Sequence, residues 1–336
     1  MIRKSILFLL IIFIYSSCQS PEQYEIKTDI LSALGEKHRI EYENIAKKLE
    51  LVIAKDSSNV DAILSYAETQ IILYIFGFTS REETLPVAKN ALTRAQVFDS
   101  ISTKYYTISG MISLLDWEWI NSKHFFEKAI EVDPTNLNAR HWLSLYYSAM
   151  GDFDLAMEQS DIIATMDPEG NYQIGRGSLL YFARRNEEMK DLMLQTVASQ
   201  PNVAWGYDWL GMAYCELEDF DNSIETYFKA FNLSDGTVEV GAGLGHALGL
   251  GGQYSLAKQM ADYYKLAAKD HYLPPVQRSF IHIGIGEYDE AITLLNQAYD
   301  EHSWFLVFMQ IEPWYDPIRK DPRFQSIIDR MDFPMN

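Results

Sequence analysis

The apolar positions of this chain follow helical patterns, in which small residues recur at a nearly fixed interval. A first ladder of small residues, with steps of about 34 residues, contains Gly110, Ser144, Ser178, Gly211, Gly245 and Ser279. A second ladder keeps the same steps and contains Ser122, Ala156, Lys190, Ser223, Ala257 and Ala291, with Lys190 as its one misfit. Two antiparallel helices approach closely only where one of them offers little side chain. The paired ladders therefore predict repeated helix hairpins that cross at these small residues.

The predicted breaks between helices follow the same interval. Asp133 and Asp167 stand one step of the ladders apart, and each precedes a proline, which cannot continue a helix. We expect both aspartates to end the second helix of a hairpin. Gly151, Gly252 and Gly286 fall near the turn inside a hairpin, where a backbone with positive φ is often needed.

The pattern extends toward the N-terminus in a looser register and breaks down near the C-terminus. Residues 60–78 and 85–99 predict one further helix pair, and residues 41–56 predict the second helix of a still earlier pair. We therefore expect about seven or eight hairpins between residues 28 and 300. The tail, residues 302–331, is rich in aromatic residues and out of period. Because the last repeat of such an array needs a cover for its exposed face, we expect the tail to supply a cap.

The chain resembles tetratricopeptide repeat (TPR) proteins, which have the same period as the two ladders. Residues 115–159 and 298–324 are similar to the TPR half of multidomain bacterial signalling proteins, where such arrays follow winged-helix regulators, nucleotide cyclases or serine/threonine kinases. No such part is recognisable ahead of the array in this sequence. The resemblance implies an all-α, TPR-type α-solenoid, a right-handed superhelix with a C-terminal cap. It also implies a protein-interaction or sensing role and no catalytic chemistry.

The N-terminus has the features of a targeting segment. Arg3 and Lys4 precede a short apolar run, Ile6–Ile14, which is too short to span a bilayer. The following "YSSC" resembles the lipobox of bacterial lipoproteins and implies lipidation of Cys18; a plain secretory signal peptide cut nearby is the alternative. We expect a lipid-anchored protein of the cell envelope, on the periplasmic or outer-membrane side. The predicted parts are a signal peptide (1–17), a tether (18–27), the repeat array (28–300) and a capping segment (301–336).

Composition narrows the possible functions. Hydrophobic residues make up 48% of the chain and charged residues 22%, as in a folded protein. The formal net charge of −19 argues against a nucleic-acid partner, because no basic patch is available to neutralise phosphates. The two cysteines, Cys18 and Cys215, provide no disulfide framework. Cys215 lies in a helical pattern, which favours a small buried apolar side chain over a nucleophile.

Motifs that suggest chemistry are explained by the repeat. The glycine-rich stretch Gly241–Gly252 lacks the spacing of a dinucleotide-binding loop, and Gly245 and Gly252 already have places in the hairpin register. The Ser-x-x-Lys of Ser255–Lys258 lacks the companion motifs of penicillin-interacting enzymes. The rings of Asp116–Trp119 could bind a ligand, but packing is the favoured interpretation. With scattered histidines and no cysteine cluster, we expect no enzyme activity, no cofactor and no metal site.

The predicted function is a membrane-anchored interaction scaffold that binds a protein or peptide segment in its concave groove. A regulatory domain that senses a small molecule and signals to a membrane partner is the alternative. The oligomeric state stays open. In a TPR hairpin the first helix lines the concave surface, and counting from the first ladder places on it Asn138, His141, Tyr172, Trp205, Asp208 and His246. Rings and polar groups together suit peptide recognition, although Tyr172 and Trp205 could instead pack between neighbouring helices.

Overall fold

The computed structural model describes residues 35–170 and 172–334, and within these ranges the chain forms helices and no strand. Cys18 and the rest of the predicted leader lie outside the described residues. The α-helices are α2 (Glu36–Lys55), α3 (Val60–Ile75), α4 (Arg81–Gln96), α5 (Thr103–Leu115), α6 (Trp119–Val132), α7 (Leu137–Ala149), α8 (Phe153–Met166), α9 (Gln173–Phe182), α10 (Asn186–Ser199), α11 (Ala204–Glu216), α12 (Phe220–Leu233), α13 (Val238–Leu250), α14 (Tyr254–Ala267), α15 (Pro275–Gly284), α16 (Tyr288–Asp300) and α17 (Pro322–Arg330). Two 3-10 helices, η2 (Trp304–Phe308) and η3 (Pro313–Tyr315), lie between α16 and α17.

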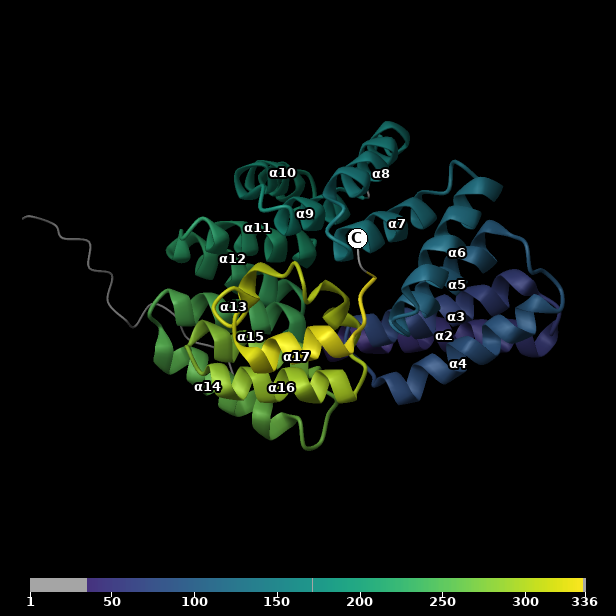
Figure 1. Cartoon of the computed structure of the whole chain (residues 1–336). Coiled ribbons are helices and arrows are strands. Elements are labelled where there is room, and N and C mark those ends of the chain that lie inside the picture. The colour runs from purple at the N-terminus through teal and green to yellow at the C-terminus, as the bar shows by residue number, and fades with distance from the viewer. Residues whose placement is uncertain (1–34, 171, 335–336) are drawn as a thin grey trace, which may run out of the picture.

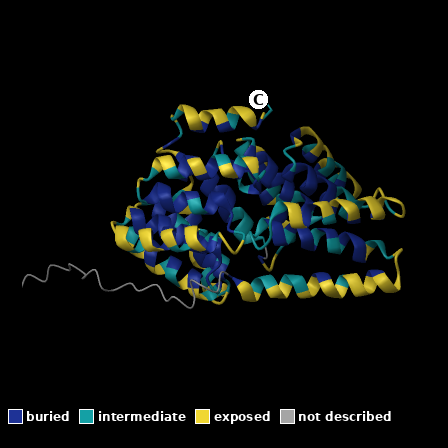
Figure 2. Ribbon diagram, turned by 90° about the horizontal axis from the view of Figure 1, so that it is seen from below, coloured by how far each residue is buried: buried dark blue, intermediate teal, exposed yellow. Residues whose placement is uncertain are grey.

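The helices α3 to α16 form seven consecutive hairpins, each with a first and a second helix. Figure 1 shows the hairpins following one another along a curved array from α2–α4 to α13–α16. The unpaired helix α2 packs on α3, as expected for the second helix of an earlier pair. Buried residues gather between the helices, and exposed residues lie on their outward turns (Figure 2). The predicted all-α solenoid is confirmed.

The two ladders of small residues meet inside the hairpins. The Ser122 hydroxyl donates to the carbonyl oxygen of Gly110 at 3.1 Å, and the Ser223 hydroxyl donates to that of Gly211 at 2.7 Å. A Cβ atom on Gly211 would lie 2.8 Å from the Tyr227 ring, which is closer than a real Cβ contact. The small residues therefore allow close helix crossings, as predicted.

Gly245 also lies at a crossing, but between different helices. Its added Cβ would meet Ile281 of α15 at 2.8 Å, and an added Cβ on Gly249 would meet the backbone of Gly284 at 2.5 Å. Both contacts join α13 to the next first helix rather than to its own hairpin partner α14. The glycine-rich stretch is thus part of a helix whose missing side chains let two first helices touch.

The predicted breaks also occur where expected. Asp133 and Asp167 end α6 and α8 with φ values of −137° and −117°, outside the helical range. Gly151, Gly252 and Gly286 have φ of 79°, 80° and 78°, in the left-handed region that favours glycine.

The tail does more than cap the last hairpin. Helix α17 lies alongside α16 (Figure 1), with Phe324 and Ile327 buried, which agrees with a cap. The preceding residues 302–318, called here the return segment, run back along the inner face that the first helices form. Their aromatic side chains reach helices far away in sequence: Phe308 stacks on Phe182 of α9 with ring centroids 4.7 Å apart. This return was not predicted, because the sequence pattern places no constraint on where an aperiodic tail goes.

A hydroxyl on the earliest hairpin fixes the start of the return segment. The Tyr74 hydroxyl of α3 donates to the carbonyl oxygen of His302 and accepts from the N–H of Trp304, both at 2.9 Å. Tyr74 is only 3% exposed, and its hydrogen bond with the N–H of Trp304 is buried, whereas the one with His302 is partly buried. The first and last parts of the chain are therefore joined through one side chain.

The array also closes on itself at another point. The N–H of Gly35 donates to the carbonyl oxygen of Asp235 at 2.9 Å. Phe76, just after α3, stacks on Trp205 of α11 with ring centroids 5.3 Å apart. The earliest described helices thus contact the middle of the array, and the inner face becomes enclosed.

We predict that Gly211→Leu destabilises the fold, because its side chain must displace the buried ring of Tyr227. Overpacking of this kind costs on the order of 1–3 kcal/mol. Thermal unfolding followed by circular dichroism should show a lower Tm with unchanged helix content at room temperature. Glu225→Leu, on the exposed face of α12, is the control and should leave the Tm nearly unchanged. Equal Tm values for wild type and Gly211→Leu would contradict the crossing.

We predict that Tyr74→Phe loosens the return segment, because it leaves the His302 carbonyl and the Trp304 N–H without their buried partner. An unsatisfied buried group costs about 1–3 kcal/mol. Tyr66→Phe on the same helix is the matched control, since its hydroxyl donates to Glu50 at the surface. Chemical denaturation should show a clear loss of stability for Tyr74→Phe alone. A similar small loss in both variants would mean that Tyr74 does not hold the segment.

Candidate functional site

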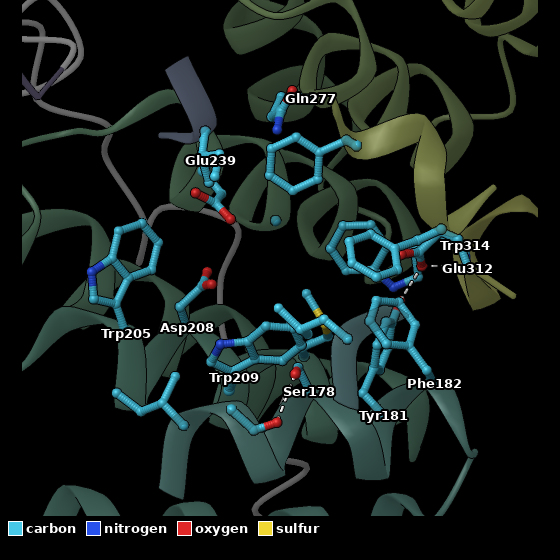
Figure 3. A pocket seen from close by; sticks show the side chains of 18 of the residues that line it. Ser178, Tyr181, Phe182, Trp205, Asp208, Trp209, Glu239, Gln277, Glu312 and Trp314 are labelled. Carbon is cyan, nitrogen blue, oxygen red and sulfur yellow. Dashed lines mark hydrogen bonds between the residues drawn. The ribbon is translucent and has the colours of Figure 1, made fainter. Parts of the chain in front are cut away.

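A cavity of about 310 Å³ lies between the first helices and the return segment. Helices α7, α9, α11, α13 and α15 supply one side of it, and residues 304–315 supply the other. Its surface is mainly aromatic and includes Phe280 and Trp304. Figure 3 shows four further rings of the lining, those of Tyr181, Trp205, Trp209 and Trp314. A concave, largely apolar space with a few polar groups is the usual form of a small-ligand site.

Three of the six predicted groove residues line this cavity: His141, Trp205 and Asp208. Asn138 does not; its amide donates to Glu68 of α3 at 3.0 Å and so joins two first helices.

The remaining two predicted residues make packing contacts beside the cavity. The Tyr172 ring lies 5.7 Å from that of His141. His246 is 2% exposed; its Nδ1 forms a hydrogen bond of 2.8 Å with the carbonyl oxygen of Phe280, and its ring stacks on Trp314 at 4.1 Å. The interpretation of Tyr172 as a packing residue fits this arrangement, and His246 is occupied by the return segment.

Two carboxyl groups face the cavity from neighbouring first helices. Asp208 of α11 is 4% exposed, and Glu239 lies in the first turn of α13. Among the described residues, neither side chain has a hydrogen-bond or ion-pair partner. Burial raises the pKa of Asp208 to about 7, and it raises the pKa of Glu239 well above its ordinary value, with the charge of Asp208 adding to the effect. The two acids therefore resist ionisation where they lie.

A third carboxyl group, that of Glu312, belongs to the return segment. It accepts hydrogen bonds from the Tyr181 hydroxyl and, at 3.0 Å, from the N–H of Trp314. Burial nevertheless raises its pKa to about 7. Figure 3 shows Glu312 on one side of the cavity and Asp208 with Glu239 on the other.

No cationic side chain balances these acids within the described lining, which contains neither lysine nor arginine. Burial lowers the pKa of His141 to about 4, so this imidazole is neutral near pH 7. Gln277 of α15 is 2% exposed, and its side-chain oxygen is buried without a partner among the described atoms. The charged groups of the described lining are thus all acids, while the Ser178 hydroxyl and the indole N–H groups of the tryptophans add neutral polar groups.

The chemistry-like motifs lie outside this cavity or in regular packing. Residues Val238–Leu250 form helix α13, so the glycine-rich stretch is no phosphate-binding loop. Ser255 is exposed, and Lys258 pairs with Glu287 at 3.1 Å. Cys215 is 3% exposed, and burial raises the pKa of its thiol. No group of three or more metal-ligating side chains occurs in residues 35–170 and 172–334.

The tryptophans of Asp116–Trp119 pack against the C-terminal part of the chain. Trp117 stacks on His302 at 3.5 Å, and Trp119 stacks on Phe333 at 4.6 Å. The packing interpretation of this motif fits, although the partners come from the tail and not from a neighbouring repeat.

Sequence reasoning missed several lining residues that the repeat period could have found. Glu239 follows Trp205 by one repeat period, so it occupies the equivalent inward-facing position of the next first helix. Gln277 likewise follows Gly243 by one period, and both line the cavity. Glu312 and Trp314 had no such signal, because the tail has no period.

We predict that the wild-type protein without ligand loses stability relative to Asp208→Asn as the pH rises from 5 to 8. The folded-state pKa of about 7 exceeds the ordinary value of 3.8, so the folded state holds this proton more tightly than the unfolded state does. The resulting contribution to stability is fully present below about pH 4 and is lost as the pH rises through 7. The difference should reach on the order of 2–4 kcal/mol at pH 8. Glu239, Glu312 and His141 also face the cavity, and they titrate in both proteins.

Thermal unfolding at half-unit steps of pH measures this difference. Asp262→Asn, an exposed residue of α14, is the control and should run parallel to wild type. A Tm difference between Asp208→Asn and wild type that does not change with pH would contradict the burial of an unpaired acid.

Comparison with known proteins agrees with the architecture. A family model described as a tetratricopeptide repeat matches residues 125–158. A chain in the crystal structure of the APC/C hetero-tetramer Cut9–Hcn1 superimposes with a TM-score of 0.58 at 14% identity; the match covers 87% of this chain and 53% of that one. This chain therefore spans about half the length of the matched chain.

Two further solved structures share the fold. A tetratricopeptide repeat protein from Parabacteroides merdae ATCC 43184 matches with a TM-score of 0.54 at 14% identity, over 76% of this chain and 99% of its own. Yeast Tom70 matches with a TM-score of 0.50 at 17% identity, over 92% of this chain and 69% of its own. At such identities the likeness concerns the fold alone. The described chain has the fold of a tetratricopeptide-type α-solenoid, and residues 125–158 match the repeat itself.

Proposed function

We propose that this protein is a membrane-tethered, non-catalytic binding module whose enclosed cavity recognises a small ligand. The observation that carries the proposal is the pair of unpartnered carboxyl groups, Asp208 and Glu239, inside an aromatic cavity. Buried charges without partners cost stability, and proteins keep such groups mainly at functional sites. Ser178, His141 and Asp208 all line the cavity, but no hydrogen bond joins them among the described residues, and the Ser178 hydroxyl donates to the carbonyl oxygen of Gly175 at 2.7 Å.

The return segment favours a small ligand over an extended peptide. Residues 302–318 lie along the inner face of the first helices, where a peptide in the concave groove would run. A peptide of several residues would have to displace this segment and its buried rings. The remaining space of about 310 Å³ is at the lower end of the range for small-molecule sites. The sensing alternative from the sequence therefore becomes the leading function.

A protein-interaction scaffold is the second candidate. It is favoured by the fold, which is typical of such scaffolds, and by the matched chain of the Cut9–Hcn1 hetero-tetramer, which was solved as part of a complex. A partner could bind the outward faces of the hairpins without disturbing the return segment. The two functions are compatible if ligand occupancy changes what the outer surface presents to a partner.

The membrane tether rests on the sequence before residue 35. A charged start, a short apolar run and Cys18 support a lipid anchor at the cell envelope. Within residues 35–170 and 172–334, none of the helices has the length and hydrophobicity needed to cross a bilayer. A lipid on Cys18 would place the solenoid next to the membrane through the tether.

We predict that filling the cavity abolishes ligand binding. Met212 lines the cavity from α11, and Met212→Trp adds a large side chain to a space of about 310 Å³. Thermal-shift screening of a metabolite panel should identify ligands that stabilise wild type and fail to stabilise this variant. Leu194→Trp, at a position 41% exposed on α10, is the control and should bind as wild type does. Ligands that stabilise both variants equally would place the site outside the cavity.

We predict that Cys18→Ala releases the protein from membranes or leaves an uncleaved precursor, because the lipid-accepting thiol is gone. Fractionation of cells and mass measurement of the N-terminus check this. A variant that matures and stays on membranes as wild type does would contradict the lipid anchor while leaving the cavity proposal untouched.

A further inference from the structure

We propose that the cavity binds an organic ammonium ion, with a linear diamine as its best-matched form. The inference rests on the proposed function, because it assigns a chemical class to the ligand of the same cavity. Three features carry it: unpaired acids, aromatic walls and the absence of any cation in the described lining.

The first feature is the pair of acids. Asp208 and Glu239 reach into the cavity from adjacent first helices and lie on the same side of it (Figure 3). Two carboxylates close together in a low-dielectric space repel one another and are poorly solvated. One ammonium group placed between them removes both costs, and its N–H groups can donate to both carboxylates.

The second feature is the aromatic lining. Trp205 and Trp209 flank Asp208 in α11, one turn apart on the same helix. The face of a tryptophan ring attracts cations, and the attraction is strongest where water is excluded. The rings also cover the methylene groups of an aliphatic amine. Acids and indole faces together match an ammonium ion with an apolar body.

The third feature excludes other ligand classes. An anion would find no lysine or arginine in the described lining. A metal ion prefers several oxygen ligands and water, whereas these walls are mostly aromatic, and the described residues hold no cluster of three metal ligands. A neutral polyol would bond to the carboxyl groups but would leave their charges uncompensated.

The position of Glu312 points to a ligand with two amines. Figure 3 shows Glu312 across the cavity from Asp208 and Glu239, beside Tyr181 and Trp314. Its carboxylate already accepts two hydrogen bonds, which leaves lone pairs for one more donor. A chain with an ammonium at each end would meet a carboxyl group at each side, with rings along its middle.

Isosteric probes test the charge directly. We would measure binding of 1,4-diaminobutane, 1-aminobutane, 1,4-butanediol and succinate to the full chain by calorimetry at pH 8. At this pH the acids with a pKa of about 7 are mostly ionised, and alkylamines, with a pKa of about 10, are protonated. We expect the diamine to bind most tightly, the monoamine at least fivefold more weakly, and the diol and succinate not at all.

Variants separate recognition from folding. Asp208→Asn combined with Glu239→Gln keeps the shapes and removes both charges, so affinity for the diamine should fall at least tenfold. Because neutral amides remove a buried repulsion, the Tm without ligand should not fall, which excludes misfolding as the cause. Asp262→Asn, an exposed charge change on α14, should bind the diamine as wild type does.

The outcomes distinguish this inference from the proposed function. If the diol or succinate binds as tightly as the diamine, or if the double variant keeps full affinity, the ammonium assignment is wrong. Should the metabolite panel yield only neutral or anionic ligands, the ammonium assignment also fails while ligand binding in the cavity stands. If no compound of any charge binds wild type, both proposals are overturned.

Discussion

The contact between the return segment and the inner face of the first helices determines the form of the cavity and the surroundings of its acids. An open solenoid would expose the rings of its first helices to water. Here Tyr74, Phe182 and His246, on three separate first helices, instead meet Trp304, Phe308 and Trp314. Burial of this aromatic surface favours one arrangement of the array. The groove of the solenoid is thereby reduced to a smaller, partly open cavity.

Enclosure explains why ordinary residues acquire unusual properties. Asp208 in an open groove would be hydrated and ionised, but behind the return segment it is buried and its pKa rises to about 7. The same enclosure leaves Glu239 without a donor and keeps His141 neutral. If stability alone decided which residues occupy these positions, apolar residues would be expected there. Retaining acids there gives up stability in the empty state, and a ligand of opposite charge can restore it.

Much of the fold was predictable because the same positions of each repeat carry the residues that its helix crossings and turns require. Gly110 and Gly211 mark crossings that the structure contains, and the positive φ of Gly151 follows from its place in the turn. The period also predicted inward-facing positions such as Trp205 and Asp208, which line the cavity. The crossings and the turns share one cause: each depends only on the nearest neighbours within the array.

The unpredicted features depend on contacts between distant parts of the chain. Nothing in the sequence around Glu312 indicates that it faces Tyr181, 131 residues earlier. His246 was expected to face an open groove and instead stacks on Trp314 of the same chain. Pairing over such sequence distances is decided by global shape, which a local period does not encode.

The most direct test of the account is a crystal structure of the protein soaked with 1,4-diaminobutane. The account predicts the return segment on the inner face, with Trp304 bonded to Tyr74, and an ammonium nitrogen within hydrogen-bonding distance of both Asp208 and Glu239. An empty cavity, a diamine bound elsewhere, or residues 302–318 lying away from the first helices would contradict it.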